Sequence, residues 1–240
     1  MQKVERGGQG VEKADSYPQR CFMYCTVMAK TKTPPSKKSS AKKTIAASPK
    51  PAKPVKLSGK ARTLSSKVVY KGRIFSVTSD DVAEPGGVRA TRDVIRHNGS
   101  VVILAVDTKT NPADPNILLI RQYRHAADEI LLELPAGRIE LGEKPIPAGK
   151  RELIEETGYR AKRWSKYVRY FASPGFLSEA MNILLAEDLT LGEATPEDDE
   201  RIELHMTPLS EVLRLIHAGK IVDGKTLIGV LFYDSLRRAR

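Results

Sequence analysis

An acidic helix with a defined end constrains the fold of this chain more than any other feature. Proline-flanked Ile146 opens a helical pattern that stops at Gly158, the residue type expected just past a helix C-terminus. At about 100° per residue, Glu152, Glu155 and Glu156 fall within one third of the helix circumference. Carboxylates at this spacing repel one another and destabilise a helix. The folded chain must therefore bring cations to this helix face.

These glutamates suit a hard divalent cation. All-oxygen ligands select Mg²⁺, Mn²⁺ or Ca²⁺ over zinc. The preceding loop, Leu134 to Gly137, contains a glycine that permits close backbone approach, so a main-chain carbonyl can complete the coordination. Taken alone, the three glutamates also fit a solvated acidic face that is paired with Lys150, Arg151 and Arg160.

The positive charge of the chain is concentrated at its N-terminal end. The formal net charge is +11, of which residues 1–66 carry +12 and the remaining residues carry −1. Residues 30–60 are mostly Lys, Pro, Ser, Thr and Ala, which cannot offset the entropy of ordering by burial. We therefore expect a disordered basic tail over residues 1–64 and a folded domain over residues 65–240. The tail provides either loose, salt-sensitive attraction to polyanions or solubility.

Cysteine usage and hydropathy limit the cellular setting. Cys21 and Cys25 lie in the tail and the domain has no cysteine, so we expect a reducing, cytoplasmic setting without a disulfide framework. The longest apolar stretches, such as residues 101–106 and 227–233, are far shorter than the roughly 20 residues that span a bilayer. We expect no membrane partner.

The order of strand and helix patterns predicts one α/β domain with a mixed sheet. Alternating or β-branched runs separated by turn residues predict the strands, and a 3.6-residue period predicts the helices. Expected strands cover residues 67–70, 74–78, 91–97, 100–106, 117–123, 168–172, 181–186 and 202–206. Expected helices cover residues 146–157, 209–217 and 225–238.

The acidic segment resembles the signature of the Nudix hydrolases. Gly137, Glu143 and the run from Arg151 to Gly158 (Arg-Glu-Leu-x-Glu-Glu-x-Gly) occupy its fixed positions, whereas Tyr159 stands where an aliphatic residue is usual. The resemblance implies an α/β/α sandwich with a mixed sheet, preceded by a small antiparallel strand region. It gives Gly137, Glu143, Arg151 and Gly158 structural roles, in which Arg151 holds Glu143 in place.

The same resemblance implies the metal ligands. Glu152 and Glu156 would be the principal ligands, and Glu155 would assist them. The Ala136 carbonyl and Glu133 would complete the coordination of two or three Mg²⁺ or Mn²⁺ ions. The reaction implied is hydrolysis of a nucleoside diphosphate that is linked to another group.

Features outside the signature resemble the ADP-ribose pyrophosphatase subgroup. Pro174 lies 16 residues after Gly158, in a Ser-Pro-Gly-Phe turn, and residues 92–97, 121–124 and 197–203 also look like that subgroup. By resemblance, the substrate-binding residues are Arg92, Arg121, Arg124, Pro174 and Phe176. The arginines could equally be ordinary surface charges, and the Ser-Pro-Gly-Phe segment could be a tight turn without a binding role.

A mobile carboxylate beside the metal would serve as general base. Glu200 is the candidate by resemblance, with Glu197 in reserve, so the catalytic residues would be Glu200, Glu156 and Glu152. The bland alternative is a solvated acidic loop. The four histidines, which include His97, show no ligand spacing and are assigned to packing or the surface.

The resemblance therefore predicts a metal-dependent pyrophosphatase that splits ADP-ribose, or a related nucleoside diphosphate sugar, into AMP and a sugar phosphate. Similar enzymes are homodimers, so we expect residues 65–98 to take part in dimerisation and Tyr70 or Phe75 to stack on the base. One alternative is a pyrophosphatase for another sugar nucleotide such as GDP-mannose. The other is a non-catalytic module that binds nucleic acid through the basic tail.

Overall fold

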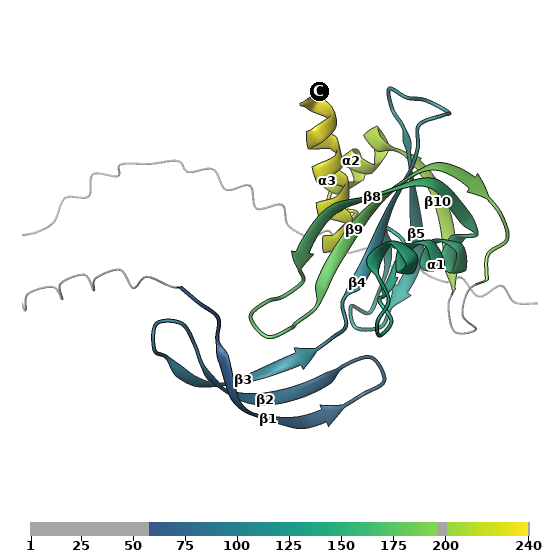
Figure 1. The fold of residues 1–240 in the computed structure, drawn as a ribbon. Coiled ribbons are helices and arrows are strands. Elements are labelled where there is room, and N and C mark those ends of the chain that lie inside the picture. Colours follow the sequence, from purple (N-terminus) through teal and green to yellow (C-terminus); the bar gives the residue numbers. More distant parts are fainter. Residues whose placement is uncertain (1–57, 196–200, 240) are drawn as a thin grey trace, which may run out of the picture. The chain divides into compact units, whose positions relative to one another are not determined.

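The strands form two sheets, which are drawn in Figure 1. The computed structural model describes residues 58–195 and 201–239, within one unit that spans Lys53–Arg240. The strands are β1 (Arg62–Lys71), β2 (Ser76–Ala83), β3 (Arg89–Arg96), β4 (Ser100–Asp107), β5 (Asn116–Arg124), β6 (Glu129–Glu133), β7 (Ala136–Arg138), β8 (Tyr159–Phe171), β9 (Ala180–Leu191) and β10 (Ile202–Pro208). The helices are α1 (Pro145–Thr157), α2 (Leu209–His217) and α3 (Gly224–Arg238).

The larger sheet is the middle layer of an α/β/α sandwich. Its order is β10-β5-β4-β9-β8, with β6 paired to β5 and β7 to β4. Successive residues of β4 face opposite layers: Val102 and Leu104 pack in a cluster with α2 and α3, whereas Val101 and Ile103 pack in a second cluster with α1. β4 runs parallel to β9 and antiparallel to β5, so the predicted mixed sheet and sandwich are confirmed.

The N-terminal sheet consists of β1, β2 and β3 in antiparallel order. The predicted break between the first two strands is present at Gly72, whose N–H donates to the Phe75 carbonyl at 2.9 Å. All ten residues of β1 are exposed, which leaves apolar side chains such as Val68 and Tyr70 in contact with water. The predicted small antiparallel region is therefore confirmed.

A loop of the sandwich pairs with the N-terminal sheet. The Ile95 N–H of β3 donates to the Phe176 carbonyl at 2.8 Å, and the Ser178 N–H donates to the Ile95 carbonyl at 2.9 Å. The His97 N–H donates to the Ser178 hydroxyl at 3.0 Å. The loop that contains Pro174 thus ties the end of β3 to the sandwich.

Element lengths differ from the sequence prediction where pairing extends a strand. The strands predicted at residues 168–172 and 181–186 are β8 and β9, which have 13 and 12 residues and pair along almost their full length. The loop predicted over residues 134–137 ends in the short strand β7, and β6 is a strand that the sequence pattern does not predict, because these residues carry no alternation of their own. Partner strands, which the local pattern does not encode, decide these lengths.

Helix α1 ends where its sequence predicts. Gly158 has φ 71°, in the left-handed region, and its N–H donates to the Ile154 carbonyl at 2.8 Å. Within the described residues, no helix is long and apolar enough to cross a membrane.

Candidate functional site

The acidic face of α1 lies against the loop that leads into β7. Glu156 is 5% exposed, and its carboxylate accepts a hydrogen bond from the Ala136 N–H at 3.0 Å. A Cβ placed on Gly137 would lie 1.9–2.1 Å from the Glu152 carboxylate. Because no side chain fits there, Gly137 is what lets this backbone approach the glutamates.

Arg151 supplies the positive charge that the clustered carboxylates need. Its Nη1 donates to Glu152 at 2.8 Å and to Glu155 at 2.9 Å, and its Nη2 donates to Glu143 at 3.2 Å. Nη2 also donates to the Arg138 carbonyl at 3.0 Å. One guanidinium therefore joins α1, the loop before it and β7.

The protonation states of Arg151 and Glu143 follow from these contacts. Burial alone would lower the pKa of Arg151, but hydrogen bonds to Glu143 and to Glu152 and Glu155 raise it above its ordinary value. The hydrogen bond from Arg151 holds the pKa of Glu143 below its usual value, although burial opposes the shift. Both groups are therefore charged at neutral pH.

The donor set fits a hard divalent cation. Glu152, Glu155 and Glu156 present only oxygen ligands on one face of α1, close to the main chain of Ala136. Arg151 bridges two of the carboxylates, and within residues 58–195 and 201–239 no group of three acidic, His or Cys side chains already has the geometry of a metal site. Metal binding would therefore require the carboxylates or Arg151 to adjust.

An open cavity of about 860 Å³ lies beside these glutamates. Glu152 and Glu155 line it from α1, and Gly137 lines it from β7. Its size falls within the range of about 300–1,000 Å³ that small-molecule sites occupy. The acidic helix therefore faces a space that admits a nucleotide-sized ligand.

Glu133 is fully buried and held by two cations. Its carboxylate accepts from Arg124 Nε at 2.6 Å and forms an ion pair with Lys225, whose Nζ also lies 3.0 Å from Asp223. Asp223 in turn caps α3 by accepting from the Thr226 N–H at 3.0 Å. A metal-ligand role for Glu133 stays a prediction, and it requires one cation to release an oxygen.

The three arginines that were predicted to bind substrate lie in different places. Arg124 lines the cavity, but it is paired with Glu133. Arg92 lies on β3, where its guanidinium donates to Glu84 at 2.8 and 3.0 Å. Arg121 pairs with Glu203 at 3.0 Å, and neither Arg92 nor Arg121 lines the cavity.

The remaining predicted site residues either do not line the cavity or lie outside the residues that the structure describes. Pro174 and Phe176 belong to the loop that pairs with β3, and neither lines the cavity. Glu197 and Glu200 lie outside the described residues, so the general base stays a prediction.

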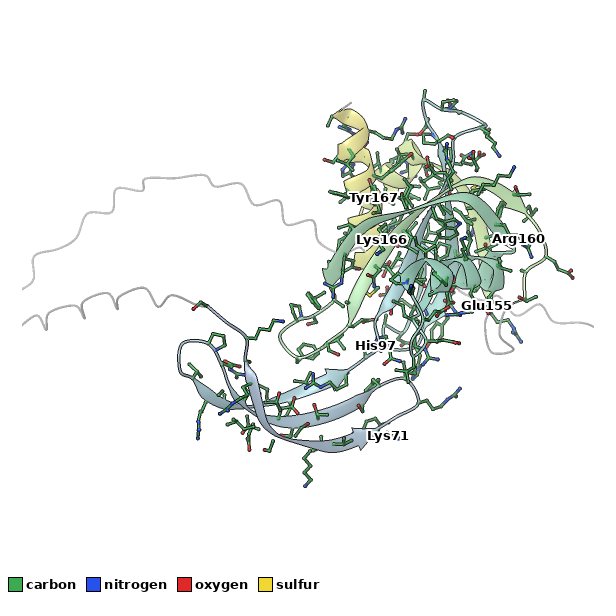
Figure 2. The ribbon with its side chains drawn as sticks, viewed as in Figure 1. Lys71, His97, Glu155, Arg160, Lys166 and Tyr167 are labelled. Atoms are coloured by element: carbon green, nitrogen blue, oxygen red, sulfur yellow. The ribbon has the colours of Figure 1, made fainter. Side chains whose placement is uncertain are left out.

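Sequence reasoning missed a cluster on another wall of the cavity. His97, Ser100 and Glu179 all line it, and the Ser100 hydroxyl donates to Glu179 at 2.5 Å. His97 Nδ1 accepts from the Gly99 N–H at 3.0 Å and lies 3.5 Å from Glu179. Figure 2 marks His97, just before β4, and Glu155 of the acidic helix. Ser100 and Glu179 are 79 residues apart, so the only local signal was the Asn98-Gly99 turn before β4.

Two family models match consecutive parts of the chain. The family model described as NUDIX domain matches residues 96–227, and the model described as nucleoside diphosphate sugar hydrolase N-terminal domain matches residues 62–95. The boundary between the two matches falls at the end of β3, where the N-terminal sheet ends.

Individual proteins are similar over most of the domain. ADP-ribose pyrophosphatase of Bacillus subtilis (strain 168) is 32% identical over 173 residues, which cover 71% of this chain and 91% of that protein. GDP-mannose pyrophosphatase of Klebsiella pneumoniae (strain ATCC 700721 / MGH 78578) is 33% identical over 156 residues, which cover 61% of this chain and 76% of that protein. A solved structure described as an ADP compounds hydrolase has a TM-score of 0.65 and 23% identity, and covers 78% of this chain and 98% of that one. That last likeness concerns the fold.

Proposed function

The chain belongs to the Nudix family of hydrolases, and from that membership we propose that it hydrolyses the pyrophosphate bond of ADP-ribose to AMP and ribose 5-phosphate. The observation that carries the proposal is the cavity bordered by Glu152, Glu155 and Gly137, next to which Glu156 accepts a hydrogen bond from the Ala136 N–H. The relative named ADP-ribose pyrophosphatase, which aligns over 91% of its own length, supports this substrate.

Glu152, Glu155, Glu156 and the Ala136 carbonyl would hold the divalent cations, with Mg²⁺ preferred and Mn²⁺ as substitute. Such a cation, when bound, polarises phosphoryl oxygens and lowers the pKa of a water molecule. The protein's own part is positional. Arg151 offsets the carboxylate charge, and the Ala136 N–H orients Glu156.

In the proposed reaction, a water oxygen forms a bond to one phosphorus of the diphosphate while the bond from that phosphorus to the bridging oxygen breaks. The water proton passes to a carboxylate base, for which we propose Glu200. The bridging oxygen leaves with the other phosphate, which gives two phosphomonoesters. This chemistry consumes one water and needs no redox partner.

GDP-mannose is the second candidate substrate. The relative from Klebsiella pneumoniae that is named GDP-mannose pyrophosphatase has a similar identity, although it aligns over less of its length. Both substrates present a diphosphate to the same glutamates, so a comparison of kcat/KM for ADP-ribose, GDP-mannose and other sugar nucleotides decides between them.

The test of the reaction is turnover of ADP-ribose with Mg²⁺, followed as release of AMP. Glu156→Gln removes a carboxylate charge at the metal face and should lower kcat by at least about a hundredfold, since several kcal/mol of charge stabilisation are lost. Glu129→Gln, on an exposed residue of β6, is the matched control and should leave kcat unchanged. Undiminished turnover by Glu156→Gln, or no turnover of any sugar nucleotide by the wild type, contradicts the proposal.

A further inference from the structure

Five arginine and lysine side chains line the cavity, and they differ in what already holds them. Arg124 and Lys225 are ion-paired with the buried Glu133, and Arg151 is paired with the glutamates of α1 and its preceding loop. The other two, Arg73 and Arg138, have no ion pair or side-chain hydrogen bond with any of the described residues. The cavity therefore contains three committed cations, Arg124, Lys225 and Arg151, which are already ion-paired. It also contains two available ones, Arg73 and Arg138.

The committed cations are poor candidates for substrate binding. Glu133 is 0% exposed, so moving Arg124 or Lys225 onto a phosphate would leave a carboxylate buried without full compensation. Breaking one partner from a buried charge pair is strongly unfavourable. Arg151 is likewise needed to offset Glu152 and Glu155 of α1 and Glu143 of the preceding loop.

Arg73 is held at the cavity by a tight hairpin. It lies between β1 and β2, directly after Gly72, where a Cβ would meet the Tyr70 ring at 3.0 Å and the Phe75 carbonyl at 3.3 Å. The rings of Tyr70 and Phe75 lie 5.8 Å apart across the turn. Ile74, next in sequence, lines the same cavity, and Figure 2 marks Lys71 at the start of this hairpin.

Arg138 reaches the cavity from the larger sheet. It lies in β7, where it pairs with Ser100 of β4, and its carbonyl accepts from Arg151 at 3.0 Å. Strand pairing and the hydrogen bond from Arg151 of α1 thus hold the backbone of Arg138, while its side chain is exposed. Its guanidinium is free to bind a ligand without breaking any of these contacts.

We propose that Arg73 and Arg138 bind the phosphate oxygens of the nucleoside diphosphate substrate, an inference that rests on the proposed function. A guanidinium matches two phosphate oxygens with two parallel hydrogen bonds and stays charged at any working pH. The cavity then offers the diphosphate both metal-binding carboxylates and two uncommitted arginines. The N-terminal sheet contributes directly to substrate binding through its β1–β2 hairpin.

The experiment compares Arg73→Gln and Arg138→Gln with Arg89→Gln, an exposed arginine of β3 that does not line the cavity. With ADP-ribose and Mg²⁺, each of the first two should raise KM by about tenfold, because a charge-assisted hydrogen bond is lost, and leave kcat within about threefold. Arg89→Gln should change neither. Arg73→Lys should recover part of the affinity, since the charge returns without the planar fork.

Salt dependence separates phosphate binding from a structural effect. KM of the wild type should rise with added KCl, and this rise should be shallower in Arg73→Gln and Arg138→Gln because each removes one cation–phosphate contact. An unchanged KM, a change shared equally by Arg89→Gln, or an unchanged salt dependence overturns the inference. A wild type that turns over ADP-ribose while Arg73→Gln is unaffected sinks this inference alone, whereas an inactive wild type sinks the proposed function.

Discussion

Gly137 decides how closely β7 can approach the glutamates of α1. The Cβ that it lacks would overlap the Glu152 carboxylate, which lines the cavity. The conformation of Gly137 is not in the left-handed region, so the requirement here is space and not backbone freedom. A role that the sequence assigned by resemblance thus has a steric basis.

Gly137→Ala should therefore lower kcat/KM for ADP-ribose by at least about tenfold, because displacement by about 1 Å of the carboxylate that we propose as a metal ligand is expensive in rate. Thermal unfolding should change little by comparison, since the glutamate can turn toward the cavity. Gly175→Ala, at a position where a Cβ meets nothing within 4 Å, is the control and should have full activity. Full activity of Gly137→Ala would show that the carboxylate does not need its present position.

Gly149 is unfavourable for a helix by sequence, but the packing of the structure requires it. As a helix-interior glycine it costs roughly 1 kcal/mol relative to alanine. In the structure, its Cβ would lie 2.5 Å from Leu184 Cδ1 and 3.2 Å from Trp164 Cζ3. Helix α1 packs so closely on β8 and β9 that the missing side chain is a condition of packing, and the local cost is offset there.

At the scale of elements, Glu143 and Arg151 tie the loop before α1 to the helix. Glu143 accepts from Arg151 and from the Glu140 N–H at 3.0 Å, while the N-cap residue Lys144 makes no side-chain cap. The first turn of α1 also has no acidic residue to favour its N-terminus. The ion pair therefore replaces a cap as the local anchor of this helix.

This anchor predicts a pH dependence of stability. The pKa of Glu143 is below its ordinary value of 4.5 in the folded protein, so its stabilisation is complete above pH 4.5 and is lost as pH falls through the folded value. Glu143→Gln should lower the free energy of unfolding by about 1 kcal/mol at pH 7, and should flatten its decline below pH 4.5. Urea denaturation from pH 3 to pH 7 measures the free energy of unfolding at pH 7 and its decline below pH 4.5, with Glu129→Gln as control. Equal acid slopes for Glu143→Gln and wild type would contradict the assignment.

At the scale of the whole molecule, β1 is an exposed strand that a single chain leaves uncovered. All ten of its residues are exposed, and four of them are large and apolar: Leu64, Val68, Val69 and Tyr70. Long apolar edge strands are a hazard unless another chain or element covers them. We propose that a second copy covers β1 in a homodimer.

The dimer is tested by sedimentation at micromolar concentration. The wild type should sediment as a dimer, and Val68→Glu should shift it toward monomer, because a charge would be buried in the interface. Val222→Glu is the matched control: Val222 is 56% exposed, against 58% for Val68, and lies between α2 and α3. A monomeric wild type, or equal behaviour of the two variants, refutes this placement of the interface.

The net charge differs between two parts of the chain. The net charge of +12 lies in residues 1–66, whereas residues 67–240 carry a net charge of −1. β1 begins at Arg62, so a deletion through Leu64 would remove the first three residues of a strand. A boundary before Lys53 leaves the unit that contains both sheets intact.

The sequence by itself determined the acidic helix, its glycine end and the glutamates that face the cavity. These features depend on residues within one short segment, and helical geometry converts their spacing into positions without help from the rest of the fold. The continuous apolar run of residues 101–106 likewise indicated a strand buried on both faces, and β4 packs against both helical layers.

Only the tertiary structure decided which cations are available to a substrate. Arg124 and Lys225 are committed to Glu133, and the Lys225–Glu133 pair joins residues 92 positions apart. Arg73 reaches the cavity because a hairpin of a different sheet brings it there. Long-range ion pairs depend on strand register and packing, which no local spacing encodes, so the arginines that the motif suggested are not the ones that the fold leaves free.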